Sequence, residues 1–250
     1  MSESSTTAIL SCRGMVKRFG GLVAVDNVDL DLAAGEVLAL VGDNGAGKST
    51  LVQMISGVFR ADGGTVSLDG EQKVFASPED ARAAGIETIY QDLALCDNLT
   101  AADNIFLGRE IRRRRFGLLP GLDQAEMRDR ARTVLDELHI RIPDLNAPVR
   151  ALSGGQRQAV AISRAVYWQA RIMVMDEPTA ALGVPEQRKV MDLIRLLKSR
   201  GVPVILISHN MQDVFEISDR IFVMRRGAKV GDFPTSATEP NEIVRAMIGG

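Results

Sequence analysis

The chain has 250 residues, 46% hydrophobic and 25% charged, with a formal net charge of −2. This composition is typical of a globular protein with one large domain or two small ones. Because the charge is nearly balanced, bulk attraction to nucleic acid is not expected, and we predict no nucleic-acid partner. No stretch approaches the roughly 18 consecutive apolar residues of a membrane span, and we see no secretory signal at the start. We therefore expect any role at a membrane to go through a partner chain.

The two cysteines, Cys12 and Cys96, lie far apart in the sequence and form no CxxC pair. Such isolated thiols give little support to a disulfide or a metal site. We expect both to be free.

The N-terminal part predicts antiparallel strands joined by glycine turns. Apolar and polar residues alternate in NVDLDL (27–32), which puts Val28, Leu30 and Leu32 on one face. The stretch GTVSLDG (64–70) has the same pattern. We expect these segments to pair in an antiparallel β subdomain.

Residues 37–50 read VLALVGDNGAGKST, a short buried-strand pattern that runs into a glycine-rich loop and then a helix ending at Gly57. The loop matches G-x-x-x-x-G-K-[ST] in full, in the context that such a phosphate-binding loop requires. Backbone N–H groups would point at the phosphates, Lys48 would reach the β- and γ-phosphates, and the Ser49 hydroxyl would ligate Mg²⁺. The residues expected to bind nucleotide here are Gly42, Asn44, Gly45, Ala46, Gly47, Lys48, Ser49 and Thr50.

Residues from about 92 to 160 are predicted to be mainly helical. TAADNIFLG (100–108) and DQAEMRDRARTVLDELHI (123–140) have helical spacing, and Asp123 with Glu126 predicts a capping box. The buried face of the second helix is expected to comprise Met127, Val134, Leu135 and Leu138.

Four consecutive arginines, Arg112 to Arg115, lie within this region. Three interpretations remain open: a solvated surface, a contact with a partner or with lipid headgroups, and a nucleic-acid contact. The first is the commonest role of a charge run.

Residues 151–158 read ALSGGQRQ and predict a Ser-Gly-Gly turn that opens a helix. Free N–H groups and the positive end of the helix dipole make such a turn suitable for a phosphate. The following segment has an apolar stripe at helical spacing, formed by Val160, Ile162, Ala165 and Val166. The chain thus contains a second phosphate-binding feature.

The stretch RIMVMDEPT (171–179) predicts a buried strand, Ile172 to Met175, followed directly by two carboxylates. In an open parallel sheet, ligands bind beyond the carboxyl ends of the strands. Asp176 would then hold Mg²⁺, and Glu177 would orient or deprotonate the attacking water. A solvated strand end is the alternative, but the complete phosphate-binding loop favours the catalytic interpretation.

LSGGQ just upstream of MDEP, with a phosphate-binding loop earlier, resembles the ATP-binding-cassette ATPases over nearly the whole chain. The resemblance implies a single α/β domain spanning 1–250: a P-loop NTPase core with a parallel sheet, an N-terminal antiparallel β subdomain and a helical subdomain inserted at about 92–160. In that family the LSGGQ segment covers the γ-phosphate of ATP held by the opposite subunit. Two copies would therefore enclose two ATP molecules, each covered by the partner's Ser153, Gly154, Gly155 and Gln156.

Other positions follow from the same resemblance. In VKRFGG, Phe19 lies where the family stacks an aromatic ring on adenine, although tyrosine is more usual and a plain core role is the alternative. Gln91, in IETIYQD, matches the glutamine that contacts Mg²⁺ and senses the transmembrane partner. The strand Val204 to Ile207 leads to His209, which matches the histidine that contacts the γ-phosphate and supports the catalytic glutamate. We expect His139 to be structural.

One position departs from the pattern. After MDEPTA the family commonly has a loop that ends in aspartate, whereas this chain has Ala181, Leu182 and Gly183. Glycine also occurs there in some sugar-importer ATPases. We expect weakened or rearranged communication across the dimer and not inactivity.

Three functions are considered: the ATPase subunit of a membrane importer, an ABC ATPase acting in DNA repair or translation, and an ATP-dependent regulatory switch. The second predicts a long coiled-coil insertion or two cassettes, and the third predicts loss of Glu177 or His209; neither pattern is present. The stretch at 89–110 is similar to importer ATPases for ribose, xylose and fructose, and a single cassette favours fructose. The expected partners are a second copy, transmembrane permease subunits and, indirectly, a periplasmic sugar-binding protein. ATP and Mg²⁺ are the expected cofactors, at the cytoplasmic face of the bacterial inner membrane.

Overall fold

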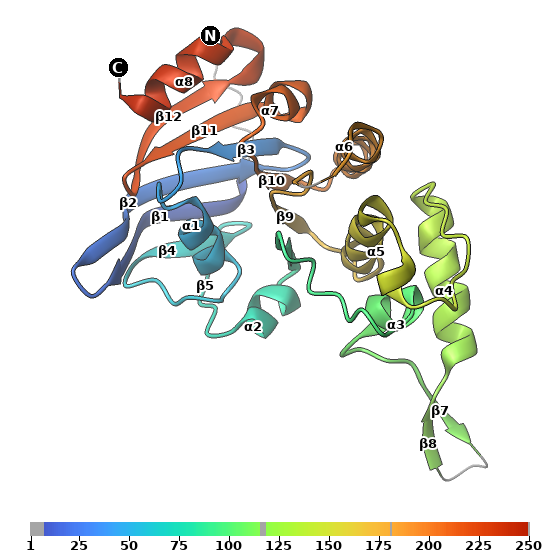
Figure 1. The fold of residues 1–250 in the computed structure, drawn as a ribbon. Coiled ribbons are helices and arrows are strands. Elements are labelled where there is room, and N and C mark those ends of the chain that lie inside the picture. The colour runs from blue at the N-terminus through green and yellow to red at the C-terminus, as the bar shows by residue number, and fades with distance from the viewer. Residues whose placement is uncertain (1–7, 116–118, 181, 250) are drawn as a thin grey trace. The chain divides into compact units, whose positions relative to one another are not determined.

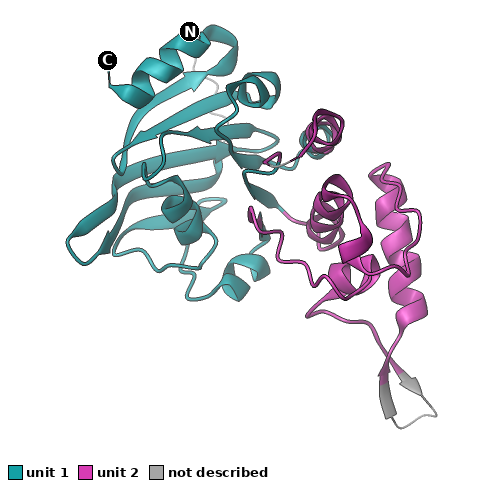
Figure 2. Cartoon of the chain, viewed as in Figure 1, with its two compact units in different colours: residues 1–88, 171–178, 194–250 teal, residues 89–170, 179–193 magenta. Residues whose placement is uncertain are grey.

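The computed structural model of the chain describes residues 8–115, 119–180 and 182–249. They fall into two compact units, shown in Figure 2: unit 1 comprises residues 1–88, 171–178 and 194–250, and unit 2 comprises residues 89–170 and 179–193. Within the described ranges, no helix has both the length and the apolar character needed to cross a membrane.

Unit 1 contains a four-stranded antiparallel sheet in the order β2-β1-β4-β5 (Figure 1). Val28, Leu30 and Leu32 are buried on one face of β2, as the alternation predicts. Antiparallel pairing joins each neighbouring pair of strands, so the predicted β subdomain is confirmed. The strands are β1 (Ala8–Phe19), β2 (Leu22–Ala33), β4 (Gly63–Leu68) and β5 (Glu71–Lys73).

A second sheet has six strands in the order β12-β11-β3-β10-β9-β6. The four strands from β11 to β9 run parallel to one another, and β12 is antiparallel to β11. Every residue of β3 and of β10 is buried, which explains why both segments read as unbroken apolar runs. The strands are β3 (Val37–Val41), β6 (Ile86–Ile89), β9 (Ile172–Asp176), β10 (Val204–Ile207), β11 (Arg220–Arg225) and β12 (Ala228–Pro234).

Alternate residues of β3 point into two different parts of the unit 1 core. Leu38 and Leu40 belong to a cluster that includes the antiparallel strands and the buried face of α1. Ala39 and Val41 belong to a second cluster with residues of α7 and α8. The helices of unit 1 are α1 (Lys48–Ile55), α2 (Pro78–Ala83), α7 (Met211–Ile217), α8 (Pro240–Ile248), the 3-10 helix η2 (Thr235–Ala237) and the second part of α6 (Val184–Ser199).

Unit 2 is mainly helical. Thr100 and Asp103 form a complete capping box at the start of α3, and Asp123 caps α4 by accepting from the Glu126 N–H at 3.2 Å. The predicted second half of the α4 box is wrong, because the Glu126 carboxylate instead pairs with Arg130 at 2.6 Å, one turn along the helix. The elements are α3 (Ala101–Phe106), β7 (Arg112–Arg115), β8 (Leu119–Leu122), α4 (Gln124–Glu137), η1 (Val149–Ala151), α5 (Gly154–Tyr167) and the first part of α6.

His139 ends helix α4. Its φ is +56°, its N–H donates to Asp136 O at 3.0 Å, and the Ile140 N–H donates to Leu135 O at 2.8 Å. These two bonds form a Schellman motif, with histidine in the left-handed position that glycine usually occupies. The side chain is exposed, and a structural role for His139 as the helix end stays our prediction.

The arginine run forms β7, which pairs with β8 in a two-stranded hairpin. Arg112 and Arg113 are exposed, and the Arg113 guanidinium lies 4.0 Å from the Asp123 carboxylate. Exposed arginines are accessible both to solvent and to a partner, so all three interpretations of the run stay open.

Both cysteines are free: Cys12 is buried and Cys96 is half-buried. Burial raises the pKa of the Cys12 thiol to about 12. At neutral pH Cys12 is therefore a small apolar core residue and not a nucleophile.

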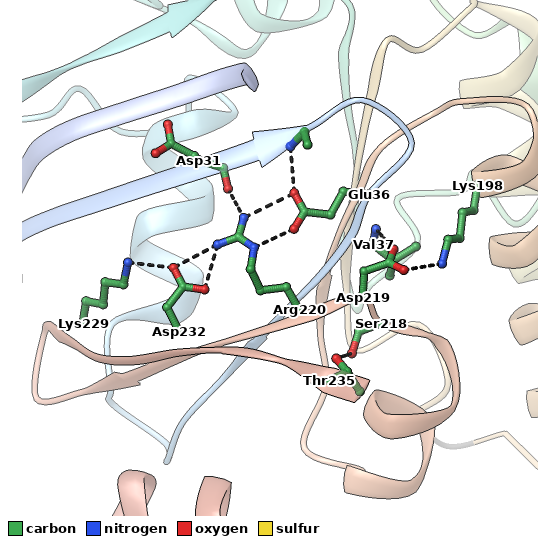
Figure 3. A network of polar contacts seen from close by, with 11 residues as sticks. Asp31, Glu36, Val37, Lys198, Ser218, Asp219, Arg220, Lys229, Asp232 and Thr235 are labelled. Atoms are coloured by element: carbon green, nitrogen blue, oxygen red, sulfur yellow. Dashed lines mark hydrogen bonds and ion pairs between the residues drawn. The ribbon is translucent and has the colours of Figure 1, made fainter. Parts of the chain in front are cut away.

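Arg220 joins three segments of unit 1 through one guanidinium group (Figure 3). It binds Glu36 at 2.6 Å, Asp232 at 2.8 Å and the carbonyl oxygen of Asp31. Burial opposes its charge, but hydrogen bonds to the two carboxylates outweigh this effect and raise the pKa of Arg220 above its usual value. Since the three side chains are between 12% and 25% exposed, this network is largely shielded from water.

We predict that Arg220→Met lowers the free energy of unfolding by about 3 kcal/mol, because it leaves a buried carboxylate without its cation. Asp232 keeps Lys229 at 2.7 Å, whereas Glu36 keeps, among the residues that the structure describes, only the Ala33 N–H. Urea denaturation measures the change. The matched control is Arg82→Met, which removes an exposed pair and should cost less than about 1 kcal/mol. Equal losses in the two variants would contradict the prediction.

Candidate functional site

The phosphate-binding loop, residues 42–49, connects β3 to α1 and requires glycine at two points. The φ angle is +149° at Gly42 and +99° at Gly47. A Cβ atom at Gly42 would lie 2.2 Å from Met224 O, and one at Gly47 would lie 2.3 Å from Ala24 O. The loop backbone therefore packs directly against β11 and β2, with no room for a side chain.

Lys48 is the first residue of α1. Its Nζ donates to the carbonyl oxygens of Gly42 at 2.6 Å and Asp43 at 3.0 Å, so the ammonium group is held against its own loop. Burial lowers the pKa of Lys48 from its usual value, although nearby negative charges of Glu177, Asp176 and Asp43 oppose the shift. Lys48 thus lies within electrostatic reach of Asp176, the predicted metal ligand, and Glu177, the predicted catalytic base.

Strand register aligns the loop with these carboxylates. Leu40 on β3 is opposite Ile207 on β10, and Ile207 is opposite Asp176 on β9. Because the three strands are parallel, the segments that follow them leave the same edge of the sheet. These segments are the phosphate-binding loop, the Ser208–His209 turn and Glu177.

Glu177 and His209 contact each other directly. The His209 Nδ1 lies 2.8 Å from the Glu177 Oε2, and the Glu177 N–H donates to Ile207 O at 2.9 Å. Glu177 has a φ of +51°, which is strained for a residue with a side chain and is typical of functional sites. The carboxylate is only 16% exposed, whereas the imidazole is 76% exposed. The arrangement directs a half-buried carboxylate toward an accessible histidine.

Asp176 and Ser49 offer oxygen ligands of the kind that Mg²⁺ prefers. Burial and then the neighbouring Glu177 charge raise the pKa of Asp176, so a cation beside it would be favourable. The described residues include no group of three or more His, Cys, Asp or Glu side chains suited to a metal ion. Magnesium is commonly held by one or two protein ligands together with substrate phosphates, and these residues fit that arrangement.

A cavity of about 480 Å³ adjoins the loop. Phe19 lines it, is 43% exposed and packs edge-on against Phe59, with ring centroids 5.2 Å apart. The plain core role considered for Phe19 is therefore wrong. The other lining residues are Leu22, Val23, Ala24, Asn44, Gly45, Ala46, Gly47, Lys48, Ser49, Thr50 and Arg226.

Four of these lining residues were not predicted from the sequence. Leu22, Val23 and Ala24 read only as the start of a strand, and Arg226 reads as an exposed turn residue before Gly227. No local pattern distinguishes them, because they reach the cavity only after β2 and β11 pack beside the loop.

The other predicted nucleotide contacts belong to unit 2. Ser153 is the N-cap of α5: its hydroxyl accepts from the Gln156 N–H at 3.3 Å, and the Gln156 Oε1 accepts from the Ser153 N–H at 2.9 Å. A Cβ atom at Gly154 would lie 2.9 Å from Leu182, and one at Gly155 would lie 2.8 Å from Glu186. The predicted turn and helix are confirmed, and the Gln156 side chain closes the helix start.

Gln91 is exposed and lies two residues after β6. Gly183 precedes α6, and its carbonyl oxygen accepts from the N–H groups of Glu186 at 3.0 Å and Gln187 at 2.9 Å. The backbone of Gly183 therefore makes the hydrogen bonds that begin α6, but this residue has no side chain to contact another copy. Ala181 lies outside the described residues.

The chain is similar to proteins of known families. A family model described as ABC transporter matches residues 25–180. The chain is 48% identical to the xylose/arabinose import ATP-binding protein XylG of Sulfolobus acidocaldarius, covering 96% of this chain and 93% of the relative. It is 50% identical to the fructose import ATP-binding protein FrcA of Rhizobium meliloti, covering 89% and 86%. It is 45% identical to the ribose import ATP-binding protein RbsA 2 of Rubrobacter xylanophilus, covering 96% of this chain but 46% of the relative.

Solved structures of ATP-binding cassettes also resemble the chain. A nucleotide-free ATP-binding cassette from an ABC transporter matches with a TM-score of 0.80 at 25% identity, covering 97% of this chain and 96% of the other. A dimeric cassette, MJ0796, in a post-hydrolysis state bound to ADP and phosphate matches with a TM-score of 0.76 at 26% identity, covering 90% and 98%. The predicted α/β P-loop NTPase fold is confirmed. The chain therefore belongs to the ABC transporter family, as one of its ATP-hydrolysing cassettes.

Proposed function

We propose that the chain is the ATP-hydrolysing subunit of a sugar importer. The observation that carries the proposal is the alignment of the phosphate-binding loop, Asp176, Glu177 and His209 along the carboxyl edge of β3, β9 and β10. The names of relatives at 45–50% identity support sugar import. The long coiled-coil insertion expected of a DNA-repair ATPase is not seen within the given sequence.

The nucleotide is held from one side by the phosphate-binding loop. Backbone N–H groups of Gly45 and Gly47 and the start of α1 face the phosphates, and Lys48 moves from its loop carbonyls to the β- and γ-phosphates. Phe19 contacts the adenine base, since its exposed ring borders the same cavity. An aromatic contact of this kind is worth about 0.5–1.5 kcal/mol beyond burial. The remaining predicted contacts in the loop are Gly42, Asn44, Ala46, Ser49 and Thr50.

Ser49 and Asp176 are the protein ligands proposed for magnesium, with Gln91 as a further ligand carried over from the family. The ion would neutralise phosphate charge during hydrolysis. Asp176 supplies a carboxylate oxygen directly or through water, and Ser49 supplies its hydroxyl.

Glu177 accepts the proton of the attacking water, since a carboxylate beside the metal is free to act as a general base. His209 holds Glu177 in place: in its imidazolium form, the Nδ1–H donates to the carboxylate and the Nε2–H donates to a γ-phosphate oxygen. The strained backbone of Glu177 is maintained by its bond to Ile207 O, so the base is positioned before substrate arrives.

A second copy completes the site. The signature turn, residues 153–156, offers free backbone N–H groups at the start of α5, and we propose that it covers the γ-phosphate held by the partner copy. The similar cassette MJ0796 is dimeric in its post-hydrolysis state, which supports this arrangement. With Gly183 in place of an acidic residue, we expect weakened or rearranged communication across the dimer and not inactivity. ATP shifts the equilibrium toward the closed dimer only to the extent that it binds the closed state more tightly than the open state.

The transmembrane partners are permease subunits, contacted through the Gln91 region and the helical unit, with a periplasmic sugar-binding protein acting indirectly. They hold the cassette at the cytoplasmic face of the inner membrane. Fructose is the first sugar to test, because the fructose-type relative is matched over most of its length and is 50% identical. Xylose, arabinose and ribose are the other candidates.

Deletion of the gene in its own host should abolish uptake of one of these four labelled sugars. Wild-type protein should restore uptake, and Glu177→Gln should not. Glu71→Gln, which changes an exposed carboxylate outside the cavity, is the matched control and should restore it fully. Normal uptake of all four sugars in the deletion strain would contradict sugar import, and a purified protein that hydrolyses no Mg-ATP would contradict the ATPase assignment.

A further inference from the structure

Arg226 occupies a turn position that disfavours arginine. Arg225 and Ala228 close the β11–β12 hairpin, and the two residues between them, Arg226 and Gly227, have φ angles of +49° and +83°. Positive φ at both central positions defines a type I′ turn, where asparagine, aspartate or glycine is preferred at the first position. An arginine kept in a strained conformation points to a role for its side chain.

The β4–β5 hairpin provides an internal comparison. It has the same two-residue turn, with Asp69 at φ +49° and Gly70 at φ +80°. Asp69 does not line the nucleotide cavity, and its turn has the favoured Asp-Gly sequence. The chain departs from the favoured residue in the hairpin that borders the cavity.

The Arg226 turn is fixed against the phosphate-binding loop. The Gly227 N–H donates to Ala46 O at 3.0 Å, and Gly227 O accepts from the Asp26 N–H at 2.8 Å. A Cβ atom at Gly47 would lie 3.4 Å from the Cα of Gly227. The middle of such a loop cradles the α- and β-phosphates, so the turn lies beside them.

The Arg226 guanidinium is available to a ligand. Neighbouring arginines are occupied: Arg220 binds two carboxylates, and Arg225 donates to Ala246 O at 3.3 Å. For Arg226, no hydrogen bond or ion pair is found within the part of the chain that the structure describes. Of the residues lining the cavity, the two with a formal charge are Lys48 and Arg226, and both are cations.

We propose that Arg226 is a nucleotide-binding residue whose guanidinium contacts the α- and β-phosphates; this rests on the proposed function, in which the cavity holds ATP. A planar guanidinium matches phosphate oxygens in a two-bond contact. Lys48 contacts the β- and γ-phosphates, and Arg226 contacts the α- and β-phosphates, which ATP and ADP have in common. Arg226 therefore sets the affinity for both nucleotides without selecting between them.

The test is to titrate wild type, Arg226→Asn and Arg226→Lys with ADP and with ATP, without divalent metal to prevent hydrolysis. Arg226→Asn should weaken both nucleotides by the same factor, about tenfold, because it removes a charged hydrogen-bond donor. It should also raise the melting temperature, because asparagine is favoured at this turn position. A loss of binding with a gain of stability is an outcome that a structural role would not produce.

Arg226→Lys keeps the charge and should stay within about threefold of wild type, since it loses only the two-bond geometry. Lys73→Asn, which removes an exposed charge outside the cavity, is the matched control and should bind as wild type. Unchanged binding in Arg226→Asn would overturn the inference and leave the proposed function intact. A loss confined to ATP would also overturn it, because the contact would then be to the γ-phosphate. Absence of binding in wild type would overturn both.

Discussion

Glu177→Gln should bind Mg-ATP as tightly as wild type, within about twofold, and hydrolyse it about 10²–10⁴ times more slowly, the range that general base catalysis contributes. Glutamine has the same shape as glutamate and can keep the His209 contact, but it cannot accept a proton. The backbone bond of residue 177 to Ile207 O is unaffected by the change. A steady-state phosphate-release assay measures the rate, and equilibrium titration measures binding.

The same variant should also accumulate as an ATP-dependent dimer, because the step that separates the two copies is blocked. Light scattering after gel filtration, with ATP and with ADP, measures the mass. Glu71→Gln is the matched acid-to-amide control and should hydrolyse ATP at the wild-type rate. Full hydrolysis by Glu177→Gln would remove Glu177 from its catalytic role.

The contact between His209 and Glu177 makes this test sharper. If His209 acts through the carboxylate 2.8 Å away, then His209→Ala should slow the wild type strongly and should slow Glu177→Gln very little. Equal rate factors in the two backgrounds would show that His209 acts independently of Glu177.

Lys48→Ala should weaken ATP binding about 10²-fold or more, because it removes a cation that makes charge-assisted hydrogen bonds to two phosphate groups, each worth about 1.5–3 kcal/mol. Binding of adenosine, which lacks the phosphates, should not change. This difference separates loss of the ammonium group from damage to the cavity. Calorimetric titration with ATP and adenosine measures both.

Lys48 also satisfies the carbonyl oxygens of Gly42 and Asp43, so its removal frees two loop acceptors. Circular dichroism of the variant should therefore accompany the titration, to confirm a folded protein. Lys73→Ala is the control for loss of one lysine at an exposed position. Unchanged ATP affinity in folded Lys48→Ala would contradict the assignment of the loop.

Strands with an unbroken apolar run were predicted closely from the sequence. The segments 37–41 and 204–207 match β3 and β10 residue for residue, because a strand buried on both faces needs an apolar residue at every position. The end of α1 before Gly57 and the start of α5 at Ser153 were also predicted, since glycine and serine act on the backbone within a few residues of themselves.

The partner of the Glu126 carboxylate and the exposure of the Phe19 ring could not be predicted from the sequence. The Glu126 carboxylate was expected to accept from the Asp123 N–H at the start of its helix. In the structure it pairs with Arg130, one turn along the helix. Phe19 was ambiguous between core and cavity, because an aromatic residue in an alternating strand is compatible with both. Its exposure was decided by the strands that pack around it.

By itself, the sequence determined the components of the site: the glycine loop with Lys48, the Asp176–Glu177 strand end and the Ser-Gly-Gly turn. Each of these depends on neighbouring residues along the chain, so short-range spacing is enough to identify it. Only the tertiary structure decided which residues meet. The register of β3, β10 and β9 and the hydrogen bond from the Gly227 N–H to Ala46 O join segments far apart along the chain. The contact of His209 with Glu177 also joins distant segments, and it was expected only from the family resemblance. Local residue patterns carry no information about such contacts, because strand pairing and packing determine them.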